Sequence, residues 1–128
     1  MSSRGQPFRV SHVDGFEILV GRGAVENDEL TFRVANPVDV WLHAAGYSGS
    51  HVIIRNPDRL SELPREVVER AAQLAVWHSK AREARGKVEV HVCKVADVRK
   101  PRGSPAGQVQ IQNWRPLRIY ARDPDELA

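Results

Sequence analysis

The chain has 128 residues, enough for one domain that buries most of the surface exposed by an unfolded chain. Hydrophobic residues make up 41% and charged residues 27%, an ordinary balance for a globular protein. Because its apolar runs are short, the sequence predicts neither a transmembrane helix nor a secretory signal peptide. The single cysteine, Cys93, excludes an intrachain disulfide and favours the reducing cytoplasm.

Positive charge is concentrated in one third of the chain, although the net charge is only +3. Residues 1–79 carry eight Lys/Arg against ten Asp/Glu, and residues 80–122 carry 11 against three. The tail 123–128 adds three acidic residues. Such a basic segment favours a polyanionic partner. The alternative is a charged surface that only maintains solubility.

Alternating apolar and polar side chains predict strands along most of the chain. The predicted strands are 16–20, 39–43, 51–55, 88–93, 109–111 and 117–119. A short helix is expected from Ala24 to about Leu30, after Gly23. Apolar residues concentrated on one face of a sheet favour an antiparallel or mixed arrangement with that face covered.

One long helix is predicted from about Pro64 to Arg85, where apolar residues recur with helical periodicity. The residues on this apolar face are Val67, Val68, Ala71, Leu74, Ala75 and Ala81. Together these elements predict an α+β fold with two layers, in which the long helix packs on one face of a mixed or mainly antiparallel sheet. We expect a single domain over 1–128, with a core at about 8–122 and short tails.

The alternation places Trp41, His43, His51, Arg55 and His91 on the sheet face opposite that helix. If this face is open, its aromatic, imidazole and guanidinium groups are suited to stacking on bases. The alternative is that the face is merely solvated, or covered by the basic loop near residue 100.

The central motif is Asp39-Val40-Trp41-Leu42-His43, followed by Gly49-Ser50-His51. In a functional interpretation Trp41 stacks on a base, and the two histidines donate to phosphate or base edges. In a structural interpretation Trp41 is a half-buried packing residue and Asp39 fixes a turn. The residues alone leave both interpretations open.

A second candidate is the basic loop Arg99-Lys100-Pro101-Arg102-Gly103. Its cations stand beside proline and glycine, so a stiff turn can bring them close to a backbone phosphate. A solvated hairpin is the alternative.

Metal binding and catalysis find little support in the sequence. The histidines lack the close paired spacing of zinc sites, so we expect neither a metal nor a cofactor. Ser50 and His51 are neighbours in a strand and point to opposite faces, so they do not form a dyad. Nothing marks Cys93 as activated. We therefore expect that the chain is not an enzyme.

Across residues 8–120 the chain resembles the NFACT-R domain, the RNA-binding module at the C-terminal end of RqcH/NEMF (FbpA-like) proteins. The resemblance is carried by Phe8-Arg9, Asp14-Gly15-Phe16, Val20-Gly21-Arg22, Asn27-Asp28, Leu30-Thr31, Asp39-x-Trp41-x-His43, Gly49-Ser50-His51-Val52, Ala71-Ala72, Ser79-x-Ala81-Arg82, Lys100-Pro101-x-Gly103 and Gly107-x-Val109. The order and spacing of these segments make the match specific. Two departures are Ser48 before Gly49, where the family has proline, and Ala106, where lysine-proline is common.

The resemblance implies contact with tRNA or rRNA, on or near the large ribosomal subunit, in ribosome-associated quality control. Full-length members carry further domains, which a separate protein partner would have to supply here. The alternative is a protein-interaction module that docks on a ribosomal or quality-control factor without touching RNA. The residues expected at the RNA interface are Asp39, Trp41, His43, Gly49, Ser50, His51, Arg55, Arg99, Lys100, Arg102 and Gly103.

Overall fold

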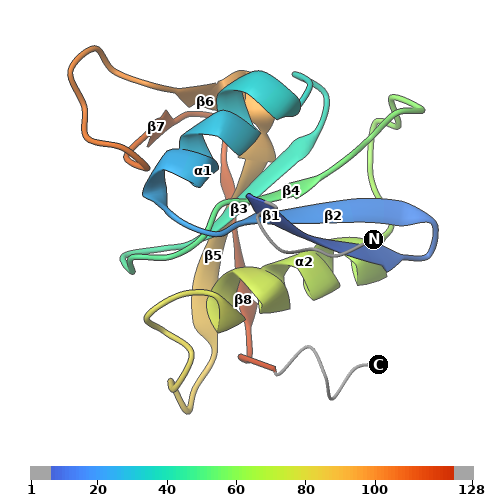
Figure 1. The fold of residues 1–128 in the computed structure, drawn as a ribbon. Helices are drawn as coiled ribbons and strands as arrows, with labels where there is room; N and C mark the ends of the chain where they lie inside the picture. Colours follow the sequence, from blue (N-terminus) through green and yellow to red (C-terminus); the bar gives the residue numbers. More distant parts are fainter. Residues whose placement is uncertain (1–6, 123–128) are drawn as a thin grey trace.

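The computed structural model describes residues 7–122, built around a six-stranded sheet (Figure 1). The strands are β1 (Phe8–Val13), β2 (Phe16–Gly21), β3 (Val40–Ala44), β4 (Val52–Ile54), β5 (Val88–Lys94) and β8 (Arg115–Ile119). Their order across the sheet is β1-β2-β4-β3-β5-β8, and every neighbouring pair is antiparallel. The expected α+β class and mainly antiparallel sheet are confirmed. The predicted tails fall, apart from Pro7, outside the described residues.

Strand β1 was not among the predicted strands, because its alternation is mostly polar. It forms a hairpin with β2 through Asp14 and Gly15, whose φ angles are 50° and 85°. An Asp-Gly pair with positive φ at both positions is the turn that joins two twisted strands most tightly. The hairpin adds an edge strand that carries Arg9.

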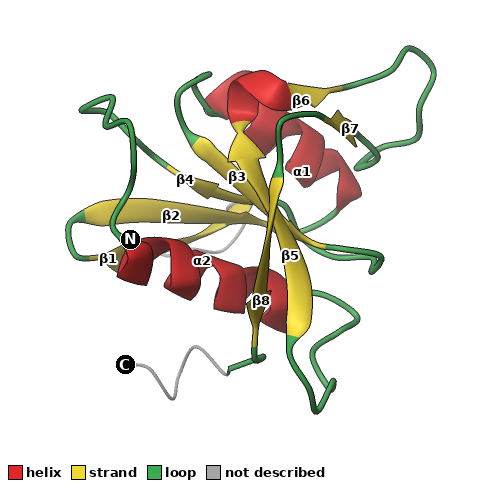
Figure 2. Cartoon of the chain, turned by 180° about the vertical axis from the view of Figure 1, so that it is seen from behind, coloured by secondary structure: helices red, strands yellow, loops and turns green. Residues whose placement is uncertain are grey.

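The long helix, α2 (Arg65–Trp77), covers one face of the sheet (Figure 2). In the register, Leu42 lies opposite Val52 on one side and Val92 on the other, so the predicted apolar face is continuous across three strands. The alanines of the helix, Ala71 and Ala75, are fully buried against it. Small side chains let the helix backbone approach the sheet closely.

Helix α2 ends at Trp77, eight residues before the predicted end at Arg85. The Ser79 hydroxyl donates to the carbonyl of Val76 and accepts from the amide of Ala81, which competes with helical hydrogen bonding. The following segment instead pairs with the 48–50 loop. The Ser50 amide donates to the carbonyl of His78, and the Lys80 amide donates to that of Ser48.

The opposite face of the sheet is also covered, so the two-layer expectation is wrong. Helix α1 (Ala24–Glu29), its continuation η1 (Leu30–Val34), the turn η2 (Val95–Asp97) and the small sheet of β6 (Val98–Arg99) with β7 (Gln110–Ile111) pack on it (Figure 1). The core beneath them contains Leu19, Leu30, Trp41, Ile53, Cys93, Val95 and Val98. The predicted strand at 109–111 therefore belongs to this cover and not to the main sheet. Among residues 7–122, no helix is long and apolar enough to cross a membrane.

Gly49 is predicted to be essential for the contact between the 48–50 loop and the end of α2. A Cβ added there would lie 2.5 Å from Ser79 Cβ and 2.9 Å from its Cα. We expect Gly49→Ala to lower the free energy of unfolding by about 1–3 kcal/mol in denaturant titrations. The control is Gly86→Ala, where a Cβ meets nothing within 4 Å. Equal stability of the two variants would contradict the importance of this contact.

Candidate nucleic-acid interface

A hollow of about 750 Å³ opens on the covered face of the sheet. Its walls come from β3, β5, the start of α1, the loop between β3 and β4, and residues 106–109 near the end of the basic loop. The ring side chains on these walls are Trp41, His43, Tyr47, His51, His78 and His91. The structure thus gathers most of the predicted platform, but as the lining of a hollow and not as an open face.

Trp41 is part of the core and only 2% exposed. Its ring stacks on His43 at 5.8 Å between centroids and meets the edge of His51 at 5.2 Å. In the register it lies between Ile53 and Cys93, which anchor it in the second core. The structural interpretation of Trp41 as a packing residue is correct, although the residue also lines the hollow.

The indole Nε1 of Trp41 is buried and has no hydrogen-bond partner among residues 7–122. A buried donor without a partner typically costs about 1–3 kcal/mol of stability. Most buried donors in folded proteins are paired, so a donor left unpaired beside a hollow calls for an explanation.

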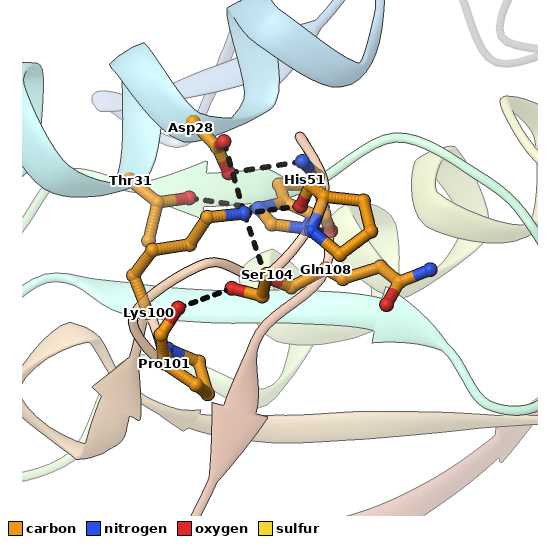
Figure 3. Close-up of polar contacts among 9 residues, drawn as sticks. Asp28, Thr31, His51, Lys100, Pro101, Ser104 and Gln108 are labelled. Atoms are coloured by element: carbon orange, nitrogen blue, oxygen red, sulfur yellow. Dashed lines mark hydrogen bonds and ion pairs between the residues drawn. The ribbon is translucent and has the colours of Figure 1, made fainter.

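His51 is almost fully buried, and both of its ring nitrogens have partners (Figure 3). Nε2 lies 3.1 Å from the carbonyl oxygen of Gly107, which can only accept, so this nitrogen carries the proton. Nδ1 then accepts from the Thr31 hydroxyl at 2.9 Å. Burial, and next the neighbouring His43, lowers the pKa of His51 to about 4. Its ring therefore joins three segments and is not free to donate to phosphate.

His43 is only half-buried and remains available to a ligand. Burial is the main cause that lowers its pKa, with His91 a further cause, while a hydrogen bond with Gly49 opposes the change. His91 packs against Trp114, with 4.1 Å between ring centroids, and lies 3.1 Å from a carboxylate oxygen of Glu89. At neutral pH His43 is an uncharged ring.

Asn27 fixes the loop that carries Gly49 and Ser50. Its buried side-chain oxygen accepts from the amide of His51 at 3.1 Å. The Ser50 hydroxyl donates to the carbonyl of Gly21 at 2.6 Å. Gly21 has no room for a side chain, since a Cβ there would lie 2.0 Å from the Asn27 oxygen. Gly49 and Ser50 therefore line the hollow, and the contacts described here for their loop hold it in place.

Lys100 is engaged inside the protein (Figure 3). Its Nζ forms an ion pair with Asp28 at 3.1 Å, and it donates to the carbonyls of Pro105 and Gln108. The other carboxylate oxygen of Asp28 accepts from the amide of Gly107. Lys100 thus folds the loop back over α1, and its side chain is about three-quarters buried.

The remaining predicted residues lie away from the hollow. Asp39 is 1% exposed; its carboxylate accepts from the amides of Asn36 and Asn56 and pairs with Arg55 at 3.0 Å. This ion pair links the residue before β3 to the residue after β4. The basic-loop residues Arg99, Arg102 and Gly103 are exposed and do not line the hollow. Figure 1 shows their loop, in orange, projecting beyond the small sheet of β6 and β7.

Cys93 is buried, and burial raises the pKa of its thiol to about 12, so the reactive thiolate is disfavoured. Within residues 7–122, no three His, Cys, Asp or Glu side chains are grouped as a metal site requires.

The sequence and the fold are similar to those of known proteins. A family described as "NFACT protein RNA binding domain" matches residues 7–113. This chain belongs to the NFACT RNA-binding domain family. Proteins named Rqc2 homolog RqcH match it at 38% identity in Streptococcus suis and at 40% in Bacillus subtilis, over 91% and 74% of the chain. The chain spans only 20% and 16% of the length of these two relatives.

Two further proteins are similar to most of the chain. A coiled-coil domain-containing protein 25 homolog from Dictyostelium discoideum is 28% identical over 81% of the chain, which corresponds to 50% of that protein. The solved structure of the C-terminal part of the fibronectin/fibrinogen-binding protein from Streptococcus suis superposes with a TM-score of 0.84 at 36% identity. That match covers 94% of this chain and 47% of the other. The fold described above is therefore shared with this solved structure.

Sequence reasoning missed several residues that build the site. Thr31, Asn27 and Asp28 each make contacts that hold His51 or the 100–108 loop in place. Tyr47, which is 43% exposed, stands on the rim of the hollow. The available signals were the segments Asn27-Asp28 and Leu30-Thr31, which carry the family resemblance but do not by themselves indicate which residues they contact.

The buried neutral His51 predicts that stability decreases in mild acid. Because its pKa is lowered from 6.5 to about 4, the unfolded chain binds the proton first as the pH falls. The stability it contributes is fully present above 6.5 and is lost progressively as the pH falls toward about 4. In denaturant titrations across this window, we expect His51→Gln to have a lower free energy of unfolding than the wild type at neutral pH. On acidification the variant should lose less of this free energy than the wild type, by roughly 1–3 kcal/mol. If the free energy of unfolding depends on pH equally in both proteins, this account is contradicted.

Lys100 is predicted to contribute to stability. Lys100→Met removes the ion pair with Asp28 and two hydrogen bonds. We expect a loss of about 1–3 kcal/mol in the free energy of unfolding, since charge-assisted bonds are the stronger class. Arg102→Met removes the same charge from an exposed side chain and should change stability little. Equal losses for both variants would show that the contacts of Lys100 do not hold the loop.

Proposed function

We propose that this NFACT domain binds RNA by taking an unpaired base into the hollow beside Trp41. The observation that carries the proposal is the buried indole N–H of Trp41, which has no partner among residues 7–122 and belongs to a side chain that lines that hollow. Nucleobase carbonyls and ring nitrogens are acceptors of the kind that this donor lacks. Single-stranded RNA is commonly read by splayed-out bases in aromatic pockets.

The other rings of the hollow suit the face of a base. His43 and His91 are half-buried and Tyr47 is exposed at the rim, so each offers part of a ring to a ligand. Because the pKa of His43 is lowered, its neutral ring can both donate and accept hydrogen bonds at a base edge. These properties favour base contact at the hollow, with phosphate contact coming from charged side chains elsewhere.

The relatives named RqcH support a role in ribosome-associated quality control. We infer that the partner is tRNA or rRNA, presented on the large ribosomal subunit in the cytoplasm. The domain would act there as a binding module and not as an enzyme, with other domains or partners supplying further activity. The buried, weakly acidic Cys93 is in keeping with a non-catalytic role.

The proposal is tested by the affinity of the purified domain for tRNA, rRNA fragments and duplex DNA across a salt series. Binding to RNA that exceeds binding to duplex DNA, and that weakens with salt, is expected. Each phosphate contact should contribute about 0.7 to the slope of log K against log salt for a single strand. Equal, weak binding to all polyanions would overturn the proposal. Capture of a ribosomal or quality-control protein that resists nuclease and salt would favour the protein-docking alternative.

Trp41→Phe is the sharpest substitution at the site. It keeps an aromatic ring but removes the N–H, which has no partner to lose in the free protein. We expect RNA affinity to fall about tenfold, as loss of one hydrogen bond of about 1.4 kcal/mol requires. The control is Ile53→Val, which trims the same core beside Trp41 in the register but does not line the hollow. An equal effect of both variants on RNA affinity would contradict a direct contact.

A further inference from the structure

A second, smaller hollow of about 280 Å³ gathers positive charge at the other side of the 48–50 loop. It is lined by Arg9 of β1, Arg22 after β2, and Lys80 and Arg82 after α2, all of them exposed. No acidic residue lines it. The turn that ends α2 early brings Lys80 and Arg82 to this place, next to residues that are far apart in the sequence.

The ion pairs among residues 7–122 involve none of these four cations. By contrast, Arg55, Arg65 and Lys100 each have a carboxylate partner. Four like charges around one hollow repel one another and weaken the fold. An anion in the hollow would remove that repulsion.

Two side chains on the wall of the small hollow, Arg82 and His78, have well-defined surroundings. The Arg82 Nε donates to the carbonyl of Trp77 at 2.8 Å, and its guanidinium lies 4.4 Å above the Trp77 ring. This leaves its terminal N–H groups for a ligand. His78, on the wall, has a pKa lowered to about 4 by burial first, and then by Arg9, Arg82 and Arg22. His78 therefore reports on the local positive potential.

The small hollow shares part of its wall with the Trp41 hollow, namely Ser48, Ser50 and His78. The rings of the larger hollow suit an aromatic group and the cations of the smaller one suit an anion. A nucleotide combines both, and its base also carries the acceptors that the Trp41 N–H lacks. Arginine is well matched to phosphate because its planar guanidinium binds two oxygens at once.

We propose that Arg9, Arg22, Lys80 and Arg82 form a binding site for a phosphate of the RNA backbone, next to the nucleotide whose base lies beside Trp41. The proposal rests on the proposed function for the nature of its ligand, but the anion site itself is an independent property. It assigns phosphate contact to residues outside the basic loop 99–103.

The first test of the site uses inorganic pyrophosphate as the probe and the ring resonances of His78 as the readout. In the wild-type protein, pyrophosphate should shift these resonances and raise the pKa of His78, because bound negative charge offsets the nearby cations. In the double variant Arg22→Gln/Lys80→Gln both effects should be lost. These two side chains are exposed and their removal leaves the Arg82–Trp77 contact intact. No shift in the wild-type protein overturns the site.

The second test measures RNA affinity across the same salt series as above. The double variant should bind RNA about tenfold or more weakly, with a salt slope reduced by about one to two units. The charge-matched control is Arg33→Gln/Arg118→Gln, two exposed cations that line neither hollow and form no ion pair among residues 7–122. Equal losses in the two double variants overturn the assignment to backbone phosphate. If pyrophosphate binds but wild-type RNA binding is absent, the proposed function fails and the anion site stands.

Discussion

The hydrogen bonds of the His51 ring hold together the parts of the molecule from which the hollow is built. This imidazole belongs to the residue just before β4; it accepts from Thr31 in the helical cover and donates to Gly107 in the loop before β7. Acceptance at Nδ1 from Thr31 requires the uncharged ring, and burial lowers the pKa of His51 enough to keep the ring uncharged at neutral pH. The Asp28–Lys100 pair and the bond from Gly107 to Asp28 secure the same loop from the other side. The hollow therefore exists because a polar network, and not apolar burial alone, positions its walls.

Much of the fold was accessible from the sequence because its physical signal is local. Alternation fixed the face on which Val52, Val90 and Leu42 lie, and these residues form the core beneath α2. The short helix was predicted within one residue, and the sheet is antiparallel as expected. The end of α2 was not predictable from periodicity, because Ala81 continues the apolar pattern and is buried. At its end the Ser79 hydroxyl competes with helical hydrogen bonding, and Ser79 also pairs with Gly49, which is distant in sequence.

The sequence left open whether the face that carries Trp41 is open or covered, although two of the strands indicate a cover. Leu19 in β2 and Ile53 in β4 are apolar on the face opposite α2, which is typical of a sheet covered on both sides. The role of Lys100 depends on Asp28, and nothing local pairs the two. The cationic hollow was missed for a similar reason, since charge was summed along contiguous segments while Arg9 and Arg22 lie in the acidic part of the chain. Such sites arise from tertiary contacts that a single sequence does not encode locally.

The central claim is that an RNA base contacts the Trp41 side chain in the hollow. The most direct measurement follows the indole N–H resonances of the chain's three tryptophans in an NMR titration with an unstructured RNA oligonucleotide. The account predicts that the Trp41 signal moves downfield as its N–H gains an acceptor, and that its exchange with water slows. If RNA saturates the domain while the Trp41 resonance stays in place, the base does not enter the hollow and the account is wrong.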